Sequence, residues 1–298
     1  MRKHHGTSVP FFFVDVFADK ALTGNPLALV PDADALSESQ MRSIAREFNQ
    51  SETTFLVTPR RPGVDWRLRS FTPIGAEVLG AGHNALGAWL WLAARGLIDV
   101  ARGAFSQEIG DAVLPVRVDI GPRGSVVVTM NQSAARFGKL VEERAELADA
   151  LGLDTSDLTD DDAQVVDTGA GHLMVPVRNR QIVDRVAPDA SLLKRALQRV
   201  EGEGCYVYSL DPVEPDSAVA YTRFFNPSMG ISEDPATGTA AGPLTALLVA
   251  SGRIADGTWG IEQGRALGRP SLIQVSVNGT DICVSGSGLV VAEGTLFL

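Results

Sequence analysis

An internal repeat constrains the fold of this 298-residue chain more than any other feature of its sequence. The segment FTPIGAEVLGAGHNALGAWLWLAARG, which begins at Phe71, resembles the segment FNPSMGISEDPATGTAAGPLTALLVASG, which begins at Phe225. The second copy has a slightly longer loop, and the matching pairs are Phe71/Phe225, Pro73/Pro227, Glu77/Glu233, Gly82/Gly238, Leu92/Leu248, Ala94/Ala250 and Gly96/Gly252. Chance matching of common residues is the alternative, but the shared order of elements favours a duplicated unit.

A weaker match extends the repeat toward the start of each copy. It pairs GNPLALV, from Gly24 to Val30, with GHLMVPV, from Gly171 to Val177. We therefore predict two similar halves, residues 1–125 and residues 126–298, and a last strand over 288–298 that can complete the first half. Each half is expected to contribute a strand, a glycine-rich loop and a helix N-terminus.

Strand and helix patterns alternate along both halves, which predicts an α/β (α+β) fold. Ser37 and Gln40 form a capping-box pattern ahead of a first helix. Further helices are expected from about Asn84 to Arg95, over 191–200 and over 240–250, with helix-ending glycines at Gly96 and Gly252. Strands are expected at FFFVDVF, GNPLALVP, SETTFLV, WRLRSFTP, QVVDTG, HLMVPV, GCYVYSL and AVAYTRFF, and a hairpin at VLPVRVDI and SVVVTM around Gly121-Pro122-Arg123-Gly124.

The chain is acidic, with 26 Lys and Arg against 36 Asp and Glu and a formal net charge of −10. That balance argues against general binding of nucleic acid or of an anionic membrane. The most apolar helical segments, GAWLWLAARG and GPLTALLVASG, are far shorter than the roughly 20 residues of a membrane span, and the N-terminal apolar run is too short for an export signal. We therefore expect a cytoplasmic protein that does not act at a membrane.

Two cysteines, Cys205 and Cys283, form no CxxC pair and have no ligand-like histidine near them in the sequence. A disulfide framework and a zinc site are therefore not expected. The sequence also lacks an HExxH motif and clustered carboxylates, so we expect no metal.

Two glycine-rich loops lead into predicted helices: GAGHNALG, which starts at Gly80, and DPATGTAAG, which starts at Asp234. The free N–H groups of a helix N-terminus carry partial positive charge and bind carboxylates readily. Gly82 and Gly238 would let the backbone approach a ligand closely. The loops therefore predict a cradle for a small carboxylate substrate. Neither loop has the glycine spacing of a nucleotide-binding motif, so no nucleotide cofactor is expected.

Candidate acids and bases lie at the edges of these loops. Glu52 stands at the start of a predicted strand, His83 follows Gly82, and Asp234 opens the second loop. These residue types suit general acid–base catalysis. Each also has a structural alternative: a solvated strand end for Glu52, an N-cap-like residue for His83 and a turn or cap residue for Asp234. His172, in the segment TGAGHLM, is a further histidine beside a glycine-rich segment, and its structural alternative is a buried strand histidine.

The segments VDVFADKALTGNPLALV, NQSETTFLV, FTPIGAEVLGAGH and FFNPSMGISEDPATGTAAGPL together resemble the PhzF-like phenazine-biosynthesis isomerase family, over most of the chain. The resemblance implies the diaminopimelate epimerase-like fold, in which two pseudo-symmetric halves each wrap a mixed sheet around a central helix and the active site lies between them. It also implies cofactor-free acid–base isomerisation of a small amino or imino acid, of the trans-2,3-dihydro-3-hydroxyanthranilate isomerase type, and a homodimer.

Carried over by position, the resemblance makes Glu52, His83 and Asp234 the catalytic residues. Gly82, Gly238 and Thr239 match positions that hold the substrate carboxylate, and Ser51, beside Glu52, is a further substrate-binding candidate.

Two departures from the family pattern bear on the substrate. Thr239 stands where the phenazine enzymes usually have Ser, which adds a methyl group to the pocket, and His83 is followed by Asn84-Ala85-Leu86 where the family often has a Pro-Thr or Ala-Thr pair. Neither cysteine occupies the loop positions at which related epimerases and racemases carry two thiols, which disfavours a two-thiol mechanism. An epimerase or hydroxy-acid dehydratase on the same scaffold, or a binding protein that has lost catalysis, remain the alternatives.

Overall fold

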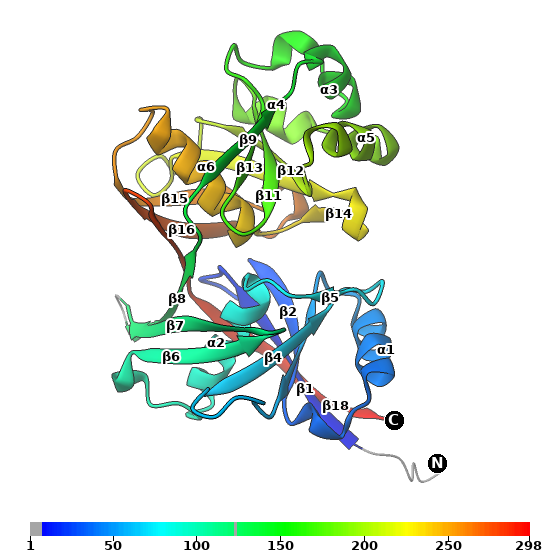
Figure 1. Ribbon diagram of the computed structural model, residues 1–298, viewed down its shortest axis with the longest axis vertical. Coiled ribbons are helices and arrows are strands. Elements are labelled where there is room, and N and C mark those ends of the chain that lie inside the picture. The colour runs from blue at the N-terminus through cyan, green and yellow to red at the C-terminus, as the bar shows by residue number, and fades with distance from the viewer. Residues whose placement is uncertain (1–7, 122–123) are drawn as a thin grey trace. The chain divides into compact units, whose positions relative to one another are not determined.

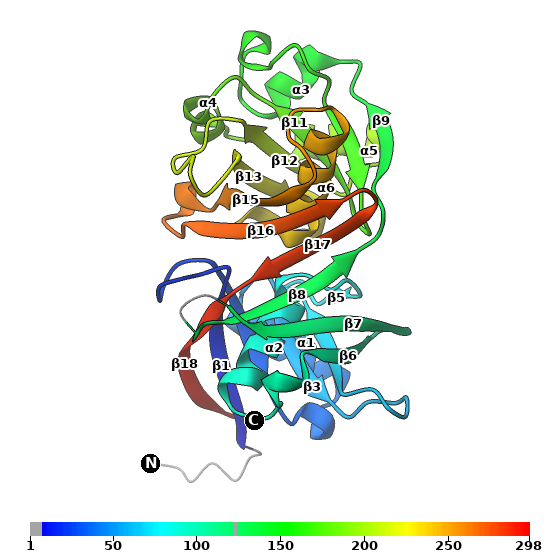
Figure 2. The ribbon, with the colours of Figure 1, turned by 90° about the vertical axis from the view of Figure 1, so that its left-hand side faces the viewer.

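The computed structural model describes residues 8–121 and 124–298 and contains two compact units (Figure 1 and Figure 2). Unit 1 comprises Met1–Met130 with Gly286–Leu298, and unit 2 comprises Asn131–Ser285. Pro122 and Arg123, at the tip of the expected hairpin, lie outside the described residues. The chain leaves unit 1 after that hairpin and returns to it for its last strand.

Unit 1 is built on a mixed sheet. Its strands are β1 (Ser8–Val16), β2 (Asn25–Val30), β3 (Thr53–Val57), β4 (Trp66–Phe71), β5 (Glu77–Val78), β6 (Ala104–Ile109), β7 (Ala112–Ile120), β8 (Val126–Gln132) and β18 (Gly288–Phe297). The last two residues of β8, Asn131 and Gln132, belong to unit 2. Antiparallel pairs join β18 to β1, β1 to β2, β3 to β4, β4 to β5, β6 to β7 and β7 to β8. The β2–β3 and β4–β6 pairs are parallel.

Helix α1 (Glu38–Phe48) covers part of this sheet. Ser37 is its N-cap, and the capping box with Gln40 is formed, as the sequence predicts. Its apolar side chains belong to a core cluster that also contains Phe55 of β3 and Phe71 of β4.

Helix α2 (His83–Ala94) runs among the strands of unit 1 (Figure 1). Nearly all of its residues are buried, because it has apolar side chains on every side and only burial can accommodate such a helix. Gly87 permits its close approach to β2, since a Cβ atom there would lie 2.5 Å from Cδ2 of Leu27. This is the central helix that the resemblance implies.

Unit 2 repeats this architecture. Its strands are β9 (Arg136–Leu140), β10 (Gln164–Asp167), β11 (Gly171–Pro176), β12 (Gly204–Ser209), β13 (Ala220–Asn226), β14 (Ile231–Asp234), β15 (Gly257–Gln263), β16 (Ser271–Asn278) and β17 (Asp281–Gly286). Its helices are α3 (Arg144–Ala150), α4 (Arg180–Arg185), α5 (Ala190–Val200) and the buried α6 (Gly238–Ala250). The β11–β12 and β13–β15 pairs are parallel and the other pairs of neighbouring strands are antiparallel, in the same order as in unit 1.

Side-chain contacts repeat together with the strands. In unit 1 the guanidinium of Arg69 binds Glu77 at 2.7 and 2.8 Å and lies 5.1 Å from the ring centre of Phe71. In unit 2 the guanidinium of Arg223 binds Glu233 at 2.9 and 2.7 Å and lies 5.0 Å from the ring centre of Phe225. The repeat in the sequence therefore corresponds to a repeat in three dimensions.

A second repeated contact fixes one loop in each unit. Glu108 of β6 is buried and accepts hydrogen bonds from the backbone N–H groups of Arg60 and Arg61 at 2.8 and 3.3 Å. Glu262 of β15 is also buried and accepts from the backbone N–H groups of Val213 and Glu214 at 2.8 and 2.9 Å. Each carboxylate thereby holds the connection that precedes β4 or β13.

The strand register corrects the weaker sequence match. That match makes Val175 the counterpart of Ala28. In unit 1, Ala28 pairs with Thr53 and Thr53 with Phe71. In unit 2, Phe225 pairs with Cys205, and Cys205 pairs with Leu173. The true counterpart of Ala28 is therefore Leu173, and the GNPLALV/GHLMVPV match is wrong by two positions.

Helix α2 begins at His83, within one residue of the predicted start, whereas α6 begins two residues earlier than the sequence predicts, at Gly238 rather than Ala240. Glycine at a helix start has low intrinsic propensity, so tertiary contacts rather than propensity set the starting point of α6. None of the helices in the described part of the chain has the length and apolar character that a membrane crossing requires.

Candidate active site

Glu52 and His83 meet at the first turn of α2. Glu52 immediately precedes β3, and His83 is the first residue of the helix, after Gly82 as N-cap. Nδ1 of His83 lies 3.4 Å from Oε2 of Glu52, and the two side chains are only 7% and 16% exposed. Nε2 of His83 is buried and has no hydrogen-bond partner among the described residues. A carboxylate and an imidazole in this arrangement can exchange a proton with a substrate.

Asn84 braces the loop that carries Gly82. Its Oδ1 accepts from the backbone N–H of Gly82 at 2.7 Å, and its Nδ2 donates to Oγ of Ser70 and to the carbonyl oxygen of Gly80, both at 3.1 Å. Asn84 is one of the residues that depart from the family pattern. Because Asn84 is 1% exposed, its side chain stabilises the conformation of the loop and does not change an exposed surface. Ser51, the remaining predicted residue of unit 1, is half-buried next to Glu52.

Asp234 ends β14 in unit 2 and is 5% exposed. Its Oδ2 accepts a 2.5 Å hydrogen bond from Oγ1 of Thr237, which is the N-cap residue of α6. The side-chain amide of Gln263 donates to the backbone oxygen of Asp234 at 2.7 Å and to Oγ1 of Thr237 at 3.0 Å. The turn between β14 and α6 is therefore fixed at both of its ends.

A buried chain of hydrogen bonds supports Gln263 in turn. The hydroxyl of Tyr206 donates to Oε1 of Gln263 at 3.0 Å, and the hydroxyl of Thr222 lies 2.8 Å from that of Tyr206. Burial raises the pKa of Tyr206, so its hydroxyl remains a donor at neutral pH. Sequence reasoning missed these residues because a buried Tyr or Gln on a strand has no local pattern that distinguishes it.

The first turn of α6 is held from the other side. Nε2 of Gln132 donates to the carbonyl oxygen of Gly238 at 2.9 Å. Gly242 makes this approach possible, because a Cβ atom there would lie 1.8 Å from Oε1 of Gln132. Thr239 is half-buried on this turn.

His172 contacts Thr239 and is the second histidine associated with these loops. It lies in β11, is 3% exposed, and its Nε2 is 3.3 Å from Oγ1 of Thr239. Burial lowers the pKa of His172 to about 4, although Asp167 acts in the opposite direction. The imidazole is thus neutral at pH 7, and it is a buried strand histidine that also orients a predicted substrate-binding hydroxyl.

Neither cysteine lies at the first turn of a central helix. Cys205 is fully buried in β12, where burial raises the pKa of its thiol, and Cys283 lies in β17. The described residues include no group of three or more His, Cys, Asp or Glu side chains that could hold a metal ion.

The predicted residues therefore form two groups, one in each unit. Ser51, Glu52, Gly82 and His83 lie together in unit 1, at the start of β3 and of α2. Asp234, Gly238 and Thr239 lie together in unit 2, at the end of β14 and the start of α6.

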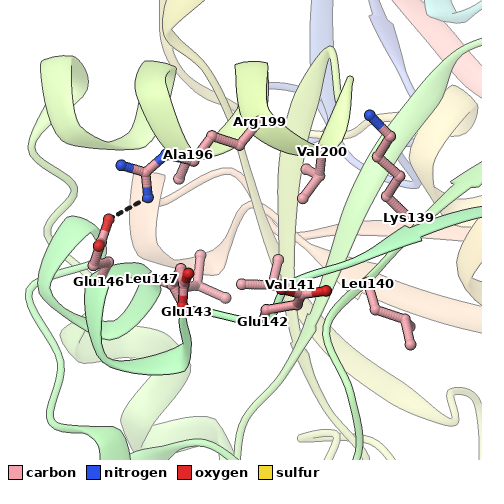
Figure 3. Close-up of a pocket in the computed structure, with 10 residues that line it drawn as sticks. All are labelled: Lys139, Leu140, Val141, Glu142, Glu143, Glu146, Leu147, Ala196, Arg199 and Val200. Atoms are coloured by element: carbon pink, nitrogen blue, oxygen red, sulfur yellow. Dashed lines mark hydrogen bonds and ion pairs between the residues drawn. The ribbon is translucent and has the colours of Figure 1, made fainter.

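A cavity of about 500 Å³ lies elsewhere in unit 2, between β9, α3 and α5 (Figure 3). No predicted site residue lines it. Arg199 and Glu146 form an ion pair across its wall, as Figure 3 shows.

A model of the phenazine biosynthesis-like protein family matches residues 14–294. The chain belongs to this family. The trans-2,3-dihydro-3-hydroxyanthranilate isomerase of Pseudomonas chlororaphis is 34% identical to this chain, over 97% of the chain and 99% of the relative. The family assignment that the sequence motifs indicate is therefore confirmed. The chain is an isomerase.

Two solved structures establish the fold. The phenazine biosynthesis protein of the PhzF family from Bacillus anthracis has a TM-score of 0.88 and 27% identity, covering 98% of this chain and 100% of that one. A hydroxyproline epimerase from Agrobacterium vitis has a TM-score of 0.67 at 14% identity, covering 97% of this chain and 91% of that one. The chain thus has the diaminopimelate epimerase-like fold, as predicted.

Proposed function

We propose that this protein moves a proton and a double bond within a small cyclic amino or imino acid, without a cofactor. The observation that carries the proposal is the buried contact between Glu52 and His83 at the first turn of α2. The substrate named for the Pseudomonas chlororaphis relative, trans-2,3-dihydro-3-hydroxyanthranilate, is the first compound to test. We also propose a role in secondary metabolism.

In the proposed reaction, Glu52 removes a proton from a carbon next to an electron-withdrawing group. The electron pair of the broken C–H bond shifts to form the new double bond. Glu52 or protonated His83 then returns a proton to another carbon, with Asp234 as the third acid–base residue, so that substrate and product are isomers. A positioned acid or base of this kind contributes roughly 10²–10⁴-fold to the rate.

We place the substrate carboxylate at the first turns of α2 and α6, beside Gly82 and Gly238, with the Thr239 hydroxyl and Ser51 as further donors. Helix N-termini suit this task because their N–H groups and dipoles favour an anion. The N–H of Gly82 itself donates to Oδ1 of Asn84, so the proposed donors are the N–H groups of His83 and Asn84 in α2. In α6 they are those of Gly238 and Thr239.

The test is proton NMR of the reaction in D₂O with dihydrohydroxyanthranilate, pyrroline-carboxylates, proline derivatives and diaminopimelate. We expect deuterium uptake and a moved double bond with one of these compounds, and a loss of about 10²-fold or more in Glu52→Gln. Glu47→Gln, an exposed glutamate on α1, is the matched control and should retain full activity. Full turnover by Glu52→Gln would contradict the role of Glu52.

The same spectra separate the alternative reactions on this scaffold. Loss of water marks a hydroxy-acid dehydratase, and inversion at one carbon without bond migration marks an epimerase.

We also propose a homodimer, which sedimentation equilibrium of the full chain would test; a monomer at micromolar concentration would contradict it.

A further inference from the structure

Helices α1 and α5 are counterparts, residue for residue, within their respective units. Each has 11 residues, a capping side chain at the N-cap, Ser37 or Asp189, and a left-handed C-cap residue, Asn49 or Glu201. Two of the three buried positions of each helix coincide as well: Met41 and Ala45 in α1 correspond to Leu193 and Leu197 in α5. This correspondence makes Ala190 the counterpart of Glu38 and Lys194 the counterpart of Arg42.

In unit 1 the Glu38 carboxylate joins two arginines. It accepts from Nη2 of Arg42 at 2.7 Å and from Nη2 of Arg69 at 2.8 Å. Nη2 of Arg69 therefore uses one N–H for Glu38 and the other for Glu77, at 2.8 Å. Both guanidinium groups lie 5.1 Å from the ring centre of Phe71.

In unit 2 the corresponding carboxylate is missing, because alanine stands at position 190. Arg223 keeps its two bonds to Glu233, and its Nη1 donates to the carbonyl oxygens of Val183, Asp184 and Val186 at 3.1, 3.2 and 2.7 Å. Nη2 makes a single hydrogen bond, to Glu233, among the described residues. Since each guanidinium Nη carries two N–H donors, one donor of this 8% exposed arginine is left over.

A cavity of about 540 Å³ occupies this place in unit 2. Its walls include Ala190, Leu193, Arg223, Phe225 and Glu233, together with further apolar residues. In the cavity of Figure 3 the arginine is already paired with a carboxylate across the wall. Here Arg223 is also paired with a carboxylate, that of Glu233, but it keeps a spare donor, and apart from Glu233 and Ser232 the side chains that line the cavity around it are apolar.

We propose that this cavity binds the carboxylate of a small acid with an apolar body. The carboxylate takes the place that the Glu38 side chain has in unit 1 and accepts the spare N–H of Arg223, while the apolar body packs on Leu193 and Phe225. Lys194 is exposed, makes no ion pair among the described residues, and stands one helical turn after Ala190. It can supply the second cation, as Arg42 does for Glu38.

The ligand would also touch β14, because Glu233 of that strand is part of the cavity wall. Glu233 directly precedes Asp234 in the sequence. This site is separate from the candidate catalytic residues, and the proposal does not depend on the proposed reaction. Binding of a probe to the full chain therefore tests it without any measurement of turnover.

The probe is 4-bromobenzoate, whose bromine can be located by anomalous scattering in soaked crystals and whose affinity can be measured by isothermal titration calorimetry. We expect a bromine peak in the cavity and saturable binding in solution. Ala190→Glu, which supplies the missing carboxylate from the chain itself, should weaken binding to this site at least tenfold. Ala190→Ser is the matched control, leaves the space open, and should bind normally.

Lys194→Met keeps the length of the side chain but removes its charge at an exposed position, so it tests the proposal even if Ala190→Glu does not fold. It should weaken binding about threefold, the size expected for one exposed ion pair. Thr239→Val separates this site from the predicted substrate carboxylate site and should leave the cavity peak unchanged. The proposal is overturned by a peak only elsewhere, by binding at crystal concentration only, or by equal affinity in wild type and Ala190→Glu.

Discussion

At the scale of single residues, burial changes the chemistry of His172 more than its sequence position indicates. An exposed histidine has a pKa near 6.5, whereas burial in β11 lowers the pKa of His172 to about 4. The ring also packs edge-on against Phe224, with 4.9 Å between ring centres. His172 is therefore a neutral hydrogen-bonding partner of Thr239 in the folded protein and does not act as a charge near pH 7.

This low pKa predicts how stability depends on pH. Below pH 6.5 the unfolded chain binds a proton at His172 that the folded chain does not bind, so stability is lost as the pH falls from 6.5 toward 4. Between pH 7 and pH 5 this group should lower the free energy of unfolding by about 2 kcal/mol. Proton NMR of the four histidines checks the cause directly, with His172→Gln to assign the signal. A titration midpoint near 6.5 for His172 would show that the ring is not desolvated.

At the scale of elements, Glu108 and Glu262 act as internal anchors between a strand and the loop beside it. Burial by itself would raise the pKa of Glu108, but hydrogen bonds from the Arg60 side chain and from the backbone N–H groups of Arg60 and Arg61 outweigh it, and the pKa is lowered. Its contribution to stability is therefore present above the usual glutamate pKa and is lost as the pH falls through the lowered value.

We expect Glu108→Gln to lower the free energy of unfolding by about 2–3 kcal/mol. The reason is that the N–H₂ of the new amide would face N–H donors that bind the Glu108 carboxylate in the wild type. Glu293→Gln is the control: Glu293 is 67% exposed and pairs with Arg95 at the surface, so its loss should cost less than about 1 kcal/mol. Urea denaturation at pH 7 measures both changes. Equal, small effects in the two variants would mean that Glu108 does not anchor its loop.

At the scale of the whole molecule, the chain completes unit 1 with its last segment. Strand β18 pairs with β1 from Ser8↔Phe297 to Val16↔Gly288, and the packing there is tight, since a Cβ atom at Gly288 would lie 2.2 Å from the carbonyl oxygen of Asp15. Unit 1 therefore cannot reach its final structure before synthesis of unit 2 is complete.

Deletion of residues 288–298 should loosen unit 1 while unit 2 stays folded. The reason is that β1 would lose one of its two neighbouring strands, and its backbone N–H groups would face water. Hydrogen exchange should show protection falling by about tenfold or more in β1 and β2, with β11 and β12 unchanged. Deletion of Leu298 alone, which follows β18, is the control. A uniform loss of protection in both units would contradict this division of the molecule.

The sequence by itself determined the features that depend on neighbours along the chain. The capping box of Ser37, the apolar central helices, the position of Glu52 before β3 and the repeat around Phe71 and Phe225 all follow from local pattern, because caps, periodicity and glycine-ended helices are set within a few residues. The family motifs added the fold, since they occur in that order in proteins whose structures are known.

Only the tertiary structure decided which distant residues meet. His172 against Thr239, the Tyr206–Gln263 chain behind Asp234, and the anchoring of a loop by Glu108 each join segments that lie far apart in the sequence. Strand register, which a pattern of period two leaves open to a shift of two residues, also moved the counterpart of Ala28 from Val175 to Leu173. Local propensity carries no information on such pairings, because they depend on how the strands are ordered and aligned in the folded sheet.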